Sequence, residues 1–327
     1  MAELVSLAVE RWPVAGSFVI SRGAKTHVDV VVCIVGDGTH EGRGEGTPIY
    51  YKGEDAQGCA DSIQSWARSG ALDRASVNAG MAAGAARNAI DCALLDLEAK
   101  QVGRPVWALA GLAEPRPTAT AFTISLGEPD AMEAAARRAA GAGYGLLKCK
   151  LTGDGDVERV GAVRRGAPDA RLIVDANESW GALDIAAEAA AMAALGVELV
   201  EQPVMRGEDE RLRGIVSPIP FCADESCQIA ADLDRLDMYS AINIKLDKAG
   251  GLTEALRLAD GARARGQGIM LGCMLGTSLG IAPAFLAAQT AHWVDLDGAL
   301  LLAEDREGGL AAEAGMLRPG TVWGGAA

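Results

Sequence analysis

Three carboxylates stand at the ends of successive apolar runs in the second half of the chain: Asp175 follows Leu-Ile-Val, Glu201 follows Leu-Val, and Asp224 follows Phe-Cys-Ala. If these runs are neighbouring parallel strands, the three side chains converge on one point, where their negative charge is costly without a counter-ion. Hard carboxylate oxygens suit Mg²⁺ or Mn²⁺, and the lack of His or Cys at these positions argues against zinc or iron. The pattern therefore predicts a Mg²⁺ site.

Two lysines, Lys150 and Lys245, end apolar runs on either side of these carboxylates. One ammonium would then face each side of a substrate lying over the metal, so that one lysine could remove a proton from carbon while the other returns a proton to the opposite face. Lys148, two residues before Lys150, points to the same face and adds a like charge. Alternatively the lysines only neutralise the carboxylates, although charge balance explains one lysine more easily than three.

These residues require strands whose carboxyl ends share one face. Beyond Thr118, short apolar runs alternate with Ala-rich amphipathic segments (129–142, 183–195 and 252–265) at intervals of roughly 20–27 residues, as parallel strands with crossover helices require. The count of eight runs, and the lack of G-x-G-x-x-G after the first, favour a (β/α) barrel over a doubly wound open sheet. The candidate strands are residues 119–124, 146–150, 171–175, 198–201, 221–224, 241–245, 268–272 and 293–296.

The first part of the chain has a different character. Residues 1 to about 51 favour an antiparallel strand meander, with a β-rich run at 28–35 and a Gly-Asp-Gly turn after it. Residues 54–103 favour helices, most clearly 81–102, which Gly103 and Pro105 end. We therefore expect an α+β domain over residues 1–115, a barrel over 116–300 and a C-terminal segment, 301–327, that returns to the first domain.

Composition narrows the class of protein. Among 327 residues, 30 Lys and Arg face 44 Asp and Glu, for a net charge of −14, with only 6 Trp, 4 Tyr and 4 Phe, which disfavours nucleic acid as a partner. No apolar run approaches the roughly 18 residues of a membrane span, and the N-terminus does not resemble a secretory signal. Seven scattered cysteines are typical of reduced thiols, so we expect a cytoplasmic protein without a membrane partner.

Nine motifs distributed over nearly the whole chain resemble one family. They are FVISRG (18–23), GAARNAIDCA (84–93), KCK (148–150), IVDANESW (173–180), EQP (201–203), ADESC (223–227), NIKLDKAGGL (243–252), LGCML (271–275) and DLDG (295–298). The sequence resembles the muconate-lactonizing branch of the enolase superfamily, and within it the L-Ala-D/L-Glu (dipeptide) epimerases. One departure is Gly276, which lies where many relatives place an acidic residue after the seventh strand.

The resemblance implies an α/β fold, a modified (β/α)7β TIM-like barrel with an N-terminal α+β capping domain. It implies Mg²⁺ held by Asp175, Glu201 and Asp224, with Lys150 and Lys245 as the opposed acid/base pair, a chemistry known for this superfamily. By the same analogy Lys148 supports the substrate carboxylate, Asp295 and Asp297 bind the free α-ammonium of a dipeptide, and Arg22 meets the side-chain carboxylate of its glutamyl residue. Thr123 would touch the substrate backbone, and residues 49–51 would form a covering loop.

The function implied is that of an isomerase, a Mg²⁺-dependent dipeptide epimerase. It would invert the α-carbon of the C-terminal residue, from L-Ala-D-Glu to L-Ala-L-Glu in murein peptide recycling, by a two-lysine 1,1-proton transfer through a metal-stabilised enediolate. The partner is then a small dipeptide, and the sequence leaves a homo-oligomer open.

Three other functions compete. A dehydratase or cycloisomerase of the same superfamily, such as o-succinylbenzoate synthase, could use the same metal and lysines, but its substrates offer no ammonium to Asp295 and Asp297. A cofactor-independent racemase would need two thiolates, for which Cys149 and Cys273 are candidates. Cys149 points away from the lysines beside it, which disfavours this function. A binding protein without turnover would be expected to lack a lysine or a metal ligand, and none is missing.

Overall fold

A parallel barrel forms the centre of the molecule. The computed structural model describes residues 2–20 and 23–325. Among them, parallel strands β5 to β12 form one eight-stranded sheet in sequence order, and the Ala121 amide donates to the Val294 carbonyl (2.7 Å), which brings the two edges together. The strands are β5 (Phe122–Ile124), β6 (Leu146–Lys150), β7 (Arg171–Asp175), β8 (Val197–Glu201), β9 (Phe221–Ala223), β10 (Ala241–Ile244), β11 (Gly268–Gly272) and β12 (Trp293–Asp295). The expected barrel is confirmed.

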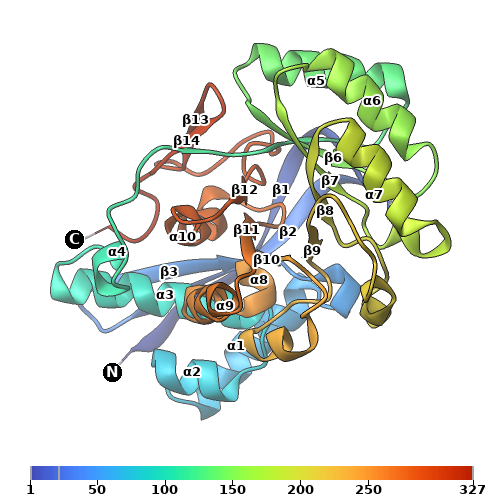
Figure 1. Cartoon of the computed structure of the whole chain (residues 1–327). Coiled ribbons are helices and arrows are strands. Elements are labelled where there is room, and N and C mark those ends of the chain that lie inside the picture. Colours follow the sequence, from blue (N-terminus) through green and yellow to red (C-terminus); the bar gives the residue numbers. More distant parts are fainter. Residues whose placement is uncertain (1, 21–22, 326–327) are drawn as a thin grey trace.

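Helices cover the outside of this barrel, and Figure 1 shows α5, α6 and α7 grouped outside β6 to β8. Their ends follow ordinary capping rules: Pro129 opens α5, and the Asp184 side chain accepts from the Ala187 amide at the start of α7. The helices of this part are α5 (Pro129–Gly141), α6 (Asp156–Gly166), η2 (Ser179–Ala182), α7 (Ile185–Ala194), η3 (Asp209–Leu212), η4 (Ala230–Arg235), α8 (Leu246–Ala249), α9 (Leu252–Ala264) and α10 (Ser278–Ala288).

The two-residue period of the strands separates the site from the outer core. Leu146, Ile173, Leu199, Cys222 and Ala241 pack together as an inner cluster. Two positions further along each strand, on the same face, come Lys148, Asp175, Glu201, Asp224 and Asn243. Residues between these positions, such as Leu147 and Val174, pack into the larger core cluster, as does Cys149. The alternation therefore brings polar side chains together at the carboxyl end of the barrel.

The capping domain is an antiparallel sheet, as expected, covered by helices. Its sheet has the order β1 (Glu3–Ile20), β2 (Gly23–Gly36) and β3 (Glu41–Gly46). Alternate glycines of β3 let it rest directly on α3, because a Cβ at Gly42 or Gly44 would lie 2.1 Å from a carbonyl oxygen of that helix. The other elements are η1 (Tyr50–Lys52), α1 (Ala56–Ser69), α2 (Arg74–Gly80), α3 (Ala85–Val102) and α4 (Val106–Leu109).

Two predicted elements differ from the structure. The helix expected over 81–102 begins only at Ala85, because Gly84 has a φ of 158°, which a right-handed helix does not allow. The strand expected over 119–124 is two strands: β4 (Thr118–Ala119) pairs with β14, and only β5 joins the barrel. The chain changes sheet at Thr120, whose amide donates to Gly315 O and whose hydroxyl accepts from the Leu296 amide.

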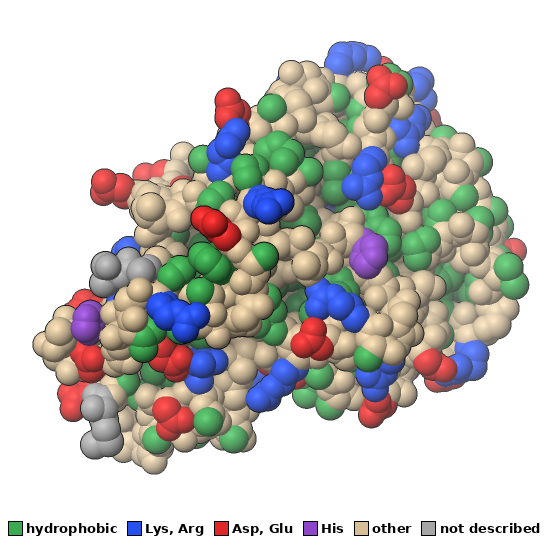
Figure 2. Space-filling view, turned by 60° about the vertical axis from the view of Figure 1, so that its left-hand side comes forward, with side chains coloured by type: hydrophobic (Ala, Val, Ile, Leu, Met, Phe, Trp, Pro, Cys, Tyr) green, Lys and Arg blue, Asp and Glu red, His purple; other side chains and the backbone are tan. Residues whose placement is uncertain are grey.

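The C-terminal segment contributes β13 (Ala311–Glu313) and β14 (Met316–Arg318). Beyond them, the Trp323 indole donates to Cys92 O (3.1 Å) and the Gly324 amide donates to Asp96 Oδ1 (2.9 Å), so this segment contacts α3 of the capping domain. No helix among the described residues is both long and apolar enough to cross a membrane. On the face in Figure 2, Lys and Arg side chains are interspersed with Asp and Glu rather than gathered in one basic patch.

Candidate active site

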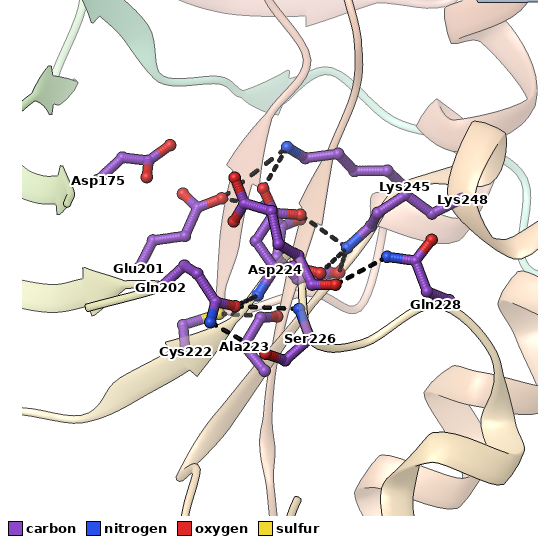
Figure 3. A network of polar contacts seen from close by, with 12 residues as sticks. Asp175, Glu201, Gln202, Cys222, Ala223, Asp224, Ser226, Gln228, Lys245 and Lys248 are labelled. Atoms are coloured by element: carbon purple, nitrogen blue, oxygen red, sulfur yellow. Dashed lines mark hydrogen bonds and ion pairs between the residues drawn. The ribbon is translucent and has the colours of Figure 1, made fainter. Parts of the chain in front are cut away.

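Asp175, Glu201 and Asp224 converge at the carboxyl end of the barrel. One carboxylate oxygen of each lies within 4.8 Å of the others, and all three side chains are buried. They come from the ends of β7 and β8 and from the residue after β9, and Figure 3 shows Glu201 and Asp224 turned toward the Lys245 ammonium, with Asp175 beside them. The structure thus brings together the three residues that the sequence singled out as metal ligands.

Three lysines surround these carboxylates. Lys148 Nζ lies 2.6 Å from Glu201 Oε2 and 3.2 Å from Asp175 Oδ2. Lys150 Nζ lies 2.7 Å from Asp175 Oδ2 on one side, and Lys245 Nζ lies 2.6 Å from Asp224 Oδ2 on the other. Because β7, β8 and β9 separate β6 from β10, Lys150 and Lys245 enter the site from opposite sides.

The charges of the cluster are unevenly compensated. Burial would lower the pKa of Lys148, but Asp295, Glu201 and Asp175 together raise it well above its ordinary value. Against its own burial, the pKa of Asp224 is held well below the ordinary range by Lys245 and Lys248. Glu201 is the exception, since burial and then the neighbouring Asp175 raise its pKa to about 8. The Lys148 ammonium beside Glu201 does not offset these two effects, and a buried cluster of three carboxylates fits a hard divalent cation such as Mg²⁺.

A second layer of residues, for which the sequence predicted no role, fixes the carboxylates. The Asn243 side chain donates to Glu201 Oε1 (2.6 Å), and the Lys248 ammonium donates to Asp224 Oδ1 (2.6 Å). Gln202 Oε1 accepts from the backbone amides of Asp224 (2.9 Å) and Ser226 (3.1 Å). Asn243 lies two residues before Lys245, so strand alternation alone could have placed it in the site. Lys248 follows the strand, and its contact with Asp224 depends on the turn of α8.

At the far side of the pocket stand two further carboxylates, Asp295 and Asp297, each 5% exposed. Lys148 Nζ lies 2.8 Å from Asp295 Oδ2, whereas Asp295 Oδ1 has no hydrogen-bond partner among the described residues. The Thr123 amide donates to Asp297 Oδ2 (2.7 Å). Burial, and then the charge of Asp295, raises the pKa of Asp297 to about 7. The pair is therefore short of positive charge and could accept a cation.

Barrel and capping domain together line the pocket. The barrel side includes Thr123, Lys148, Lys150, Lys245 and both carboxylates of the far side, and the capping domain adds Lys25, Tyr50 and Tyr51. Ile49, expected in the covering loop with the two tyrosines, is fully buried, and its amide donates to Glu54. Arg22 lies outside the described residues.

The two thiols considered for a racemase are unsuited to that task. Burial raises the pKa of Cys149 to about 12 and that of Cys273 well above its ordinary value, so both stay protonated at neutral pH. Gly276, the departure from the acidic pattern, packs near Thr47 and Glu45.

Family models match both parts of the chain. The mandelate racemase/muconate lactonizing enzyme N-terminal domain matches residues 2–111, and the enolase C-terminal domain-like model matches residues 130–321. The L-Ala-D/L-Glu epimerase of Escherichia coli K12 is 43% identical over 317 residues, which cover 96% of this chain and 98% of that protein. An N-acetyl-D-glutamate racemase of Pseudoalteromonas is 47% identical over 248 residues, which cover 75% of this chain and 78% of that protein.

Solved structures agree with these relatives. An enolase family member from Agrobacterium tumefaciens with homology to dipeptide epimerases, solved with sodium and L-Ala-L-Glu, is 46% identical with a TM-score of 0.94, over 99% of this chain and all of that one. A dipeptide epimerase from Enterococcus faecalis, solved with Mg and L-Leu-L-Tyr, is 29% identical with a TM-score of 0.91, over 99% of this chain and 98% of that one. The chain belongs to the mandelate racemase/muconate lactonizing enzyme family of the enolase superfamily.

Proposed function

We propose that this protein is a Mg²⁺-dependent dipeptide epimerase, an isomerase that interconverts L-Ala-D-Glu and L-Ala-L-Glu at the α-carbon of the glutamyl residue. The observation that carries the proposal is the arrangement of one pocket, in which Lys150 and Lys245 face each other across a carboxylate cluster while Asp295 and Asp297 stand beyond it. The relatives named as L-Ala-D/L-Glu epimerase and the related structure with L-Ala-L-Glu support it.

Asp175, Glu201 and Asp224 would hold the metal, for which the all-oxygen donor set and the crowding of three buried carboxylates are suited. A bound Mg²⁺ would stabilise the negative charge that develops on the substrate carboxylate when the α-proton leaves. Asn243 and Lys248 keep Glu201 and Asp224 oriented by the contacts described above. Lys148, buried among three carboxylates, would contact the substrate carboxylate from the same side.

Lys150 and Lys245 would move the proton. In one direction the neutral amine of one lysine takes the α-proton as the carbon–hydrogen bond breaks, and the ammonium of the other donates a proton to the opposite face of the same carbon. One proton leaves the substrate and one returns, so the configuration inverts without a redox step. The reverse direction exchanges the roles of the two lysines, which their opposed positions permit.

Asp295 and Asp297 would bind the α-ammonium of the first residue of the dipeptide, because two carboxylates can share one cation. Thr123 serves this subsite by holding Asp297 through its backbone amide, and it would also touch the substrate backbone. Arg22 would meet the glutamyl side chain. We further propose the three-part division at residues 1–115, 116–300 and 301–327, a cytoplasmic location, and a role in murein peptide recycling.

A second candidate is racemisation of N-acetylglutamate, because a racemase of that name is 47% identical over three quarters of the chain. An acetyl group carries no charge, so it would leave two buried carboxylates without the cation that they can accept. The burial of Asp295 and Asp297 therefore favours the dipeptide.

The decisive experiment is proton NMR in D₂O with enzyme and Mg²⁺, on L-Ala-L-Glu, L-Ala-D-Glu, and the two enantiomers of N-acetylglutamate. We expect loss of the glutamyl α-proton signal and appearance of the other diastereomer with both dipeptides, at rates well above those with N-acetylglutamate. Faster exchange of N-acetylglutamate would assign the racemase instead. Exchange with neither the dipeptides nor N-acetylglutamate would overturn both candidate functions and favour a dehydratase or cycloisomerase.

A further inference from the structure

A second hollow lies beside the pocket that holds the lysines. It is bounded by β1, β5 and α5, and its lining is mostly apolar. Thr123 and Leu301 line both this hollow and the pocket of the candidate active site. These two residues therefore form the wall between the hollows. The apolar lining includes Val14, Phe122, Ile124, Leu126 and Met132.

Leu301 is the part of this wall that can vary without disturbing the site. Both polar groups of its backbone are hydrogen-bonded: the amide donates to Asp297 O (3.2 Å), and the carbonyl accepts from the Ala15 amide (2.8 Å). Val14 and Leu302 add an antiparallel bridge beside it. Thr123, in contrast, holds Asp297. The Leu301 side chain itself makes no polar contact, so it can be shortened without removing a hydrogen bond from the site.

The place of this wall relates it to the first residue of a dipeptide. On the proposed function, the α-ammonium of that residue lies at Asp295 and Asp297. The side chain of the same residue is bonded to the same α-carbon as this nitrogen, so it must lie close to the two carboxylates. Leu301 lies one turn of chain beyond Asp297 and faces the same pocket. A side chain longer than a methyl group, directed at this wall, would meet Leu301 before it could enter the apolar hollow.

We propose that Leu301 is a specificity-determining residue that restricts the first residue of the dipeptide to a small side chain, and that the hollow behind it can accept an apolar side chain once Leu301 is shortened. The inference rests on the proposed function. Its occupant is an apolar side chain rather than an anion, because apart from the exposed Arg138 the side chains that line the hollow are uncharged and mostly apolar.

The test compares L-Ala-L-Glu with L-Leu-L-Glu in the wild-type enzyme, Leu301→Ala and Leu301→Val, each with Mg²⁺. We expect the kcat/KM ratio of the leucyl to the alanyl substrate to rise at least about tenfold in Leu301→Ala and less in Leu301→Val, since each buried methylene changes discrimination by roughly tenfold or more. Leu300→Ala is the matched control: Leu300 is its partly buried neighbour, packs on the same core, and lines neither hollow. Its ratio should stay that of the wild type.

Calorimetric binding of the same two dipeptides separates this proposal from the proposed function. If the wild type does not epimerise L-Ala-L-Glu, the proposed function fails, and the ratio of the two dissociation constants still shows whether Leu301 excludes the larger side chain. Suppose instead that the wild type is active. If the ratio of kcat/KM values and the ratio of dissociation constants are then unchanged in both Leu301 variants, Leu301 is not the specificity determinant. The same conclusion follows if these ratios change as much in Leu300→Ala.

Discussion

Two groups of buried or half-buried carboxylates in this molecule are satisfied in different ways. Glu45, Asp91 and Asp247 join the capping domain to the barrel, and fixed donors on the opposite part meet each of them: Glu45 accepts from the Thr277 amide, and Asp91 from the Thr253 amide and hydroxyl. In the site, Asp175, Glu201 and Asp224 crowd within 4.8 Å of one another, and each lies beside the ammonium of a buried lysine.

The difference separates structural from functional burial of charge. A carboxylate that accepts from backbone amides and hydroxyls of fixed geometry has no need of a ligand, and breaking such contacts costs stability. Three crowded carboxylates whose partners include lysine ammonium groups can exchange those ammonium groups for a cation and a substrate. The first group should therefore govern folding and the second catalysis, which can be tested residue by residue.

The largest effect is expected from the lysines. Lys150→Ala and Lys245→Ala should each lower epimerisation by at least about 1,000-fold, because each removes the proton carrier on one face. Each variant should still exchange the α-proton of the one epimer whose proton faces the remaining lysine. Proton NMR in D₂O with each pure epimer measures both. Near wild-type turnover in either variant would rule out the two-base mechanism. Arg137→Ala, which removes an exposed ion pair far from the chemistry of the lysines, is the control and should keep wild-type turnover.

Next in size is the metal affinity. Asp224→Asn should weaken Mg²⁺ binding by at least about 100-fold, because it removes one of three charged ligands. Asp247→Asn, the same chemical change in the other group of carboxylates, should leave Mg²⁺ binding and kcat within about twofold of the wild type. Titration calorimetry with MgCl₂ and turnover at saturating Mg²⁺ test the pair. Equal loss in both variants would break the distinction drawn between the two groups.

Asp297 should produce a smaller, pH-dependent effect. Its pKa of about 7 means that its carboxylate forms only as the pH rises through neutrality, and an ammonium binds the carboxylate and not the acid. We expect kcat/KM for L-Ala-L-Glu to rise about tenfold from pH 6 to pH 8, with about half of the carboxylate formed at pH 7, and to level above pH 8. Asp297→Asn should raise KM about tenfold or more with little change in kcat, and kcat/KM of this variant should depend less on pH. Unchanged KM in this variant would place the ammonium elsewhere.

The sequence allowed prediction of those parts of the site that depend on strand alternation. Asp175, Glu201 and Asp224 each end an apolar run, and a period of two with parallel pairing is enough to bring them to one point. Lys150 and Lys245 follow by the same rule. The barrel could be predicted for the same reason, since strand and helix signals repeat at short, regular distances along the chain.

What could not be predicted depends on contacts between distant segments. The donors to Glu45 lie 232 residues away at Thr277, and the Lys248 contact with Asp224 depends on a turn after the strand. The split of residues 119–124 between two sheets depends on β14, near the other end of the chain. The wall formed by Leu301 exists only because β1 passes beside it. No local period encodes such contacts.

The smallest expected effect concerns stability at Asp247. Burial raises its pKa from 3.8 to about 7, against the hydrogen bonds from the Thr47 amide and the Asn88 side chain. The folded state therefore holds this proton more tightly than the unfolded state, so the stability that the group contributes is complete below about pH 4 and is lost as the pH rises to 7. Asp247→Asn retains the acceptor oxygen but cannot titrate.

Relative to the wild type, the free energy of unfolding of this variant should increase by about 1–2 kcal/mol between pH 4 and pH 8. This is less than the full pKa shift implies, because the side chain is partly exposed. Thermal unfolding at both pH values measures this as a rise of a few degrees in the Tm difference. A difference that does not change with pH would show that Asp247 is ionised throughout, as a carboxylate satisfied by its two donors alone would be.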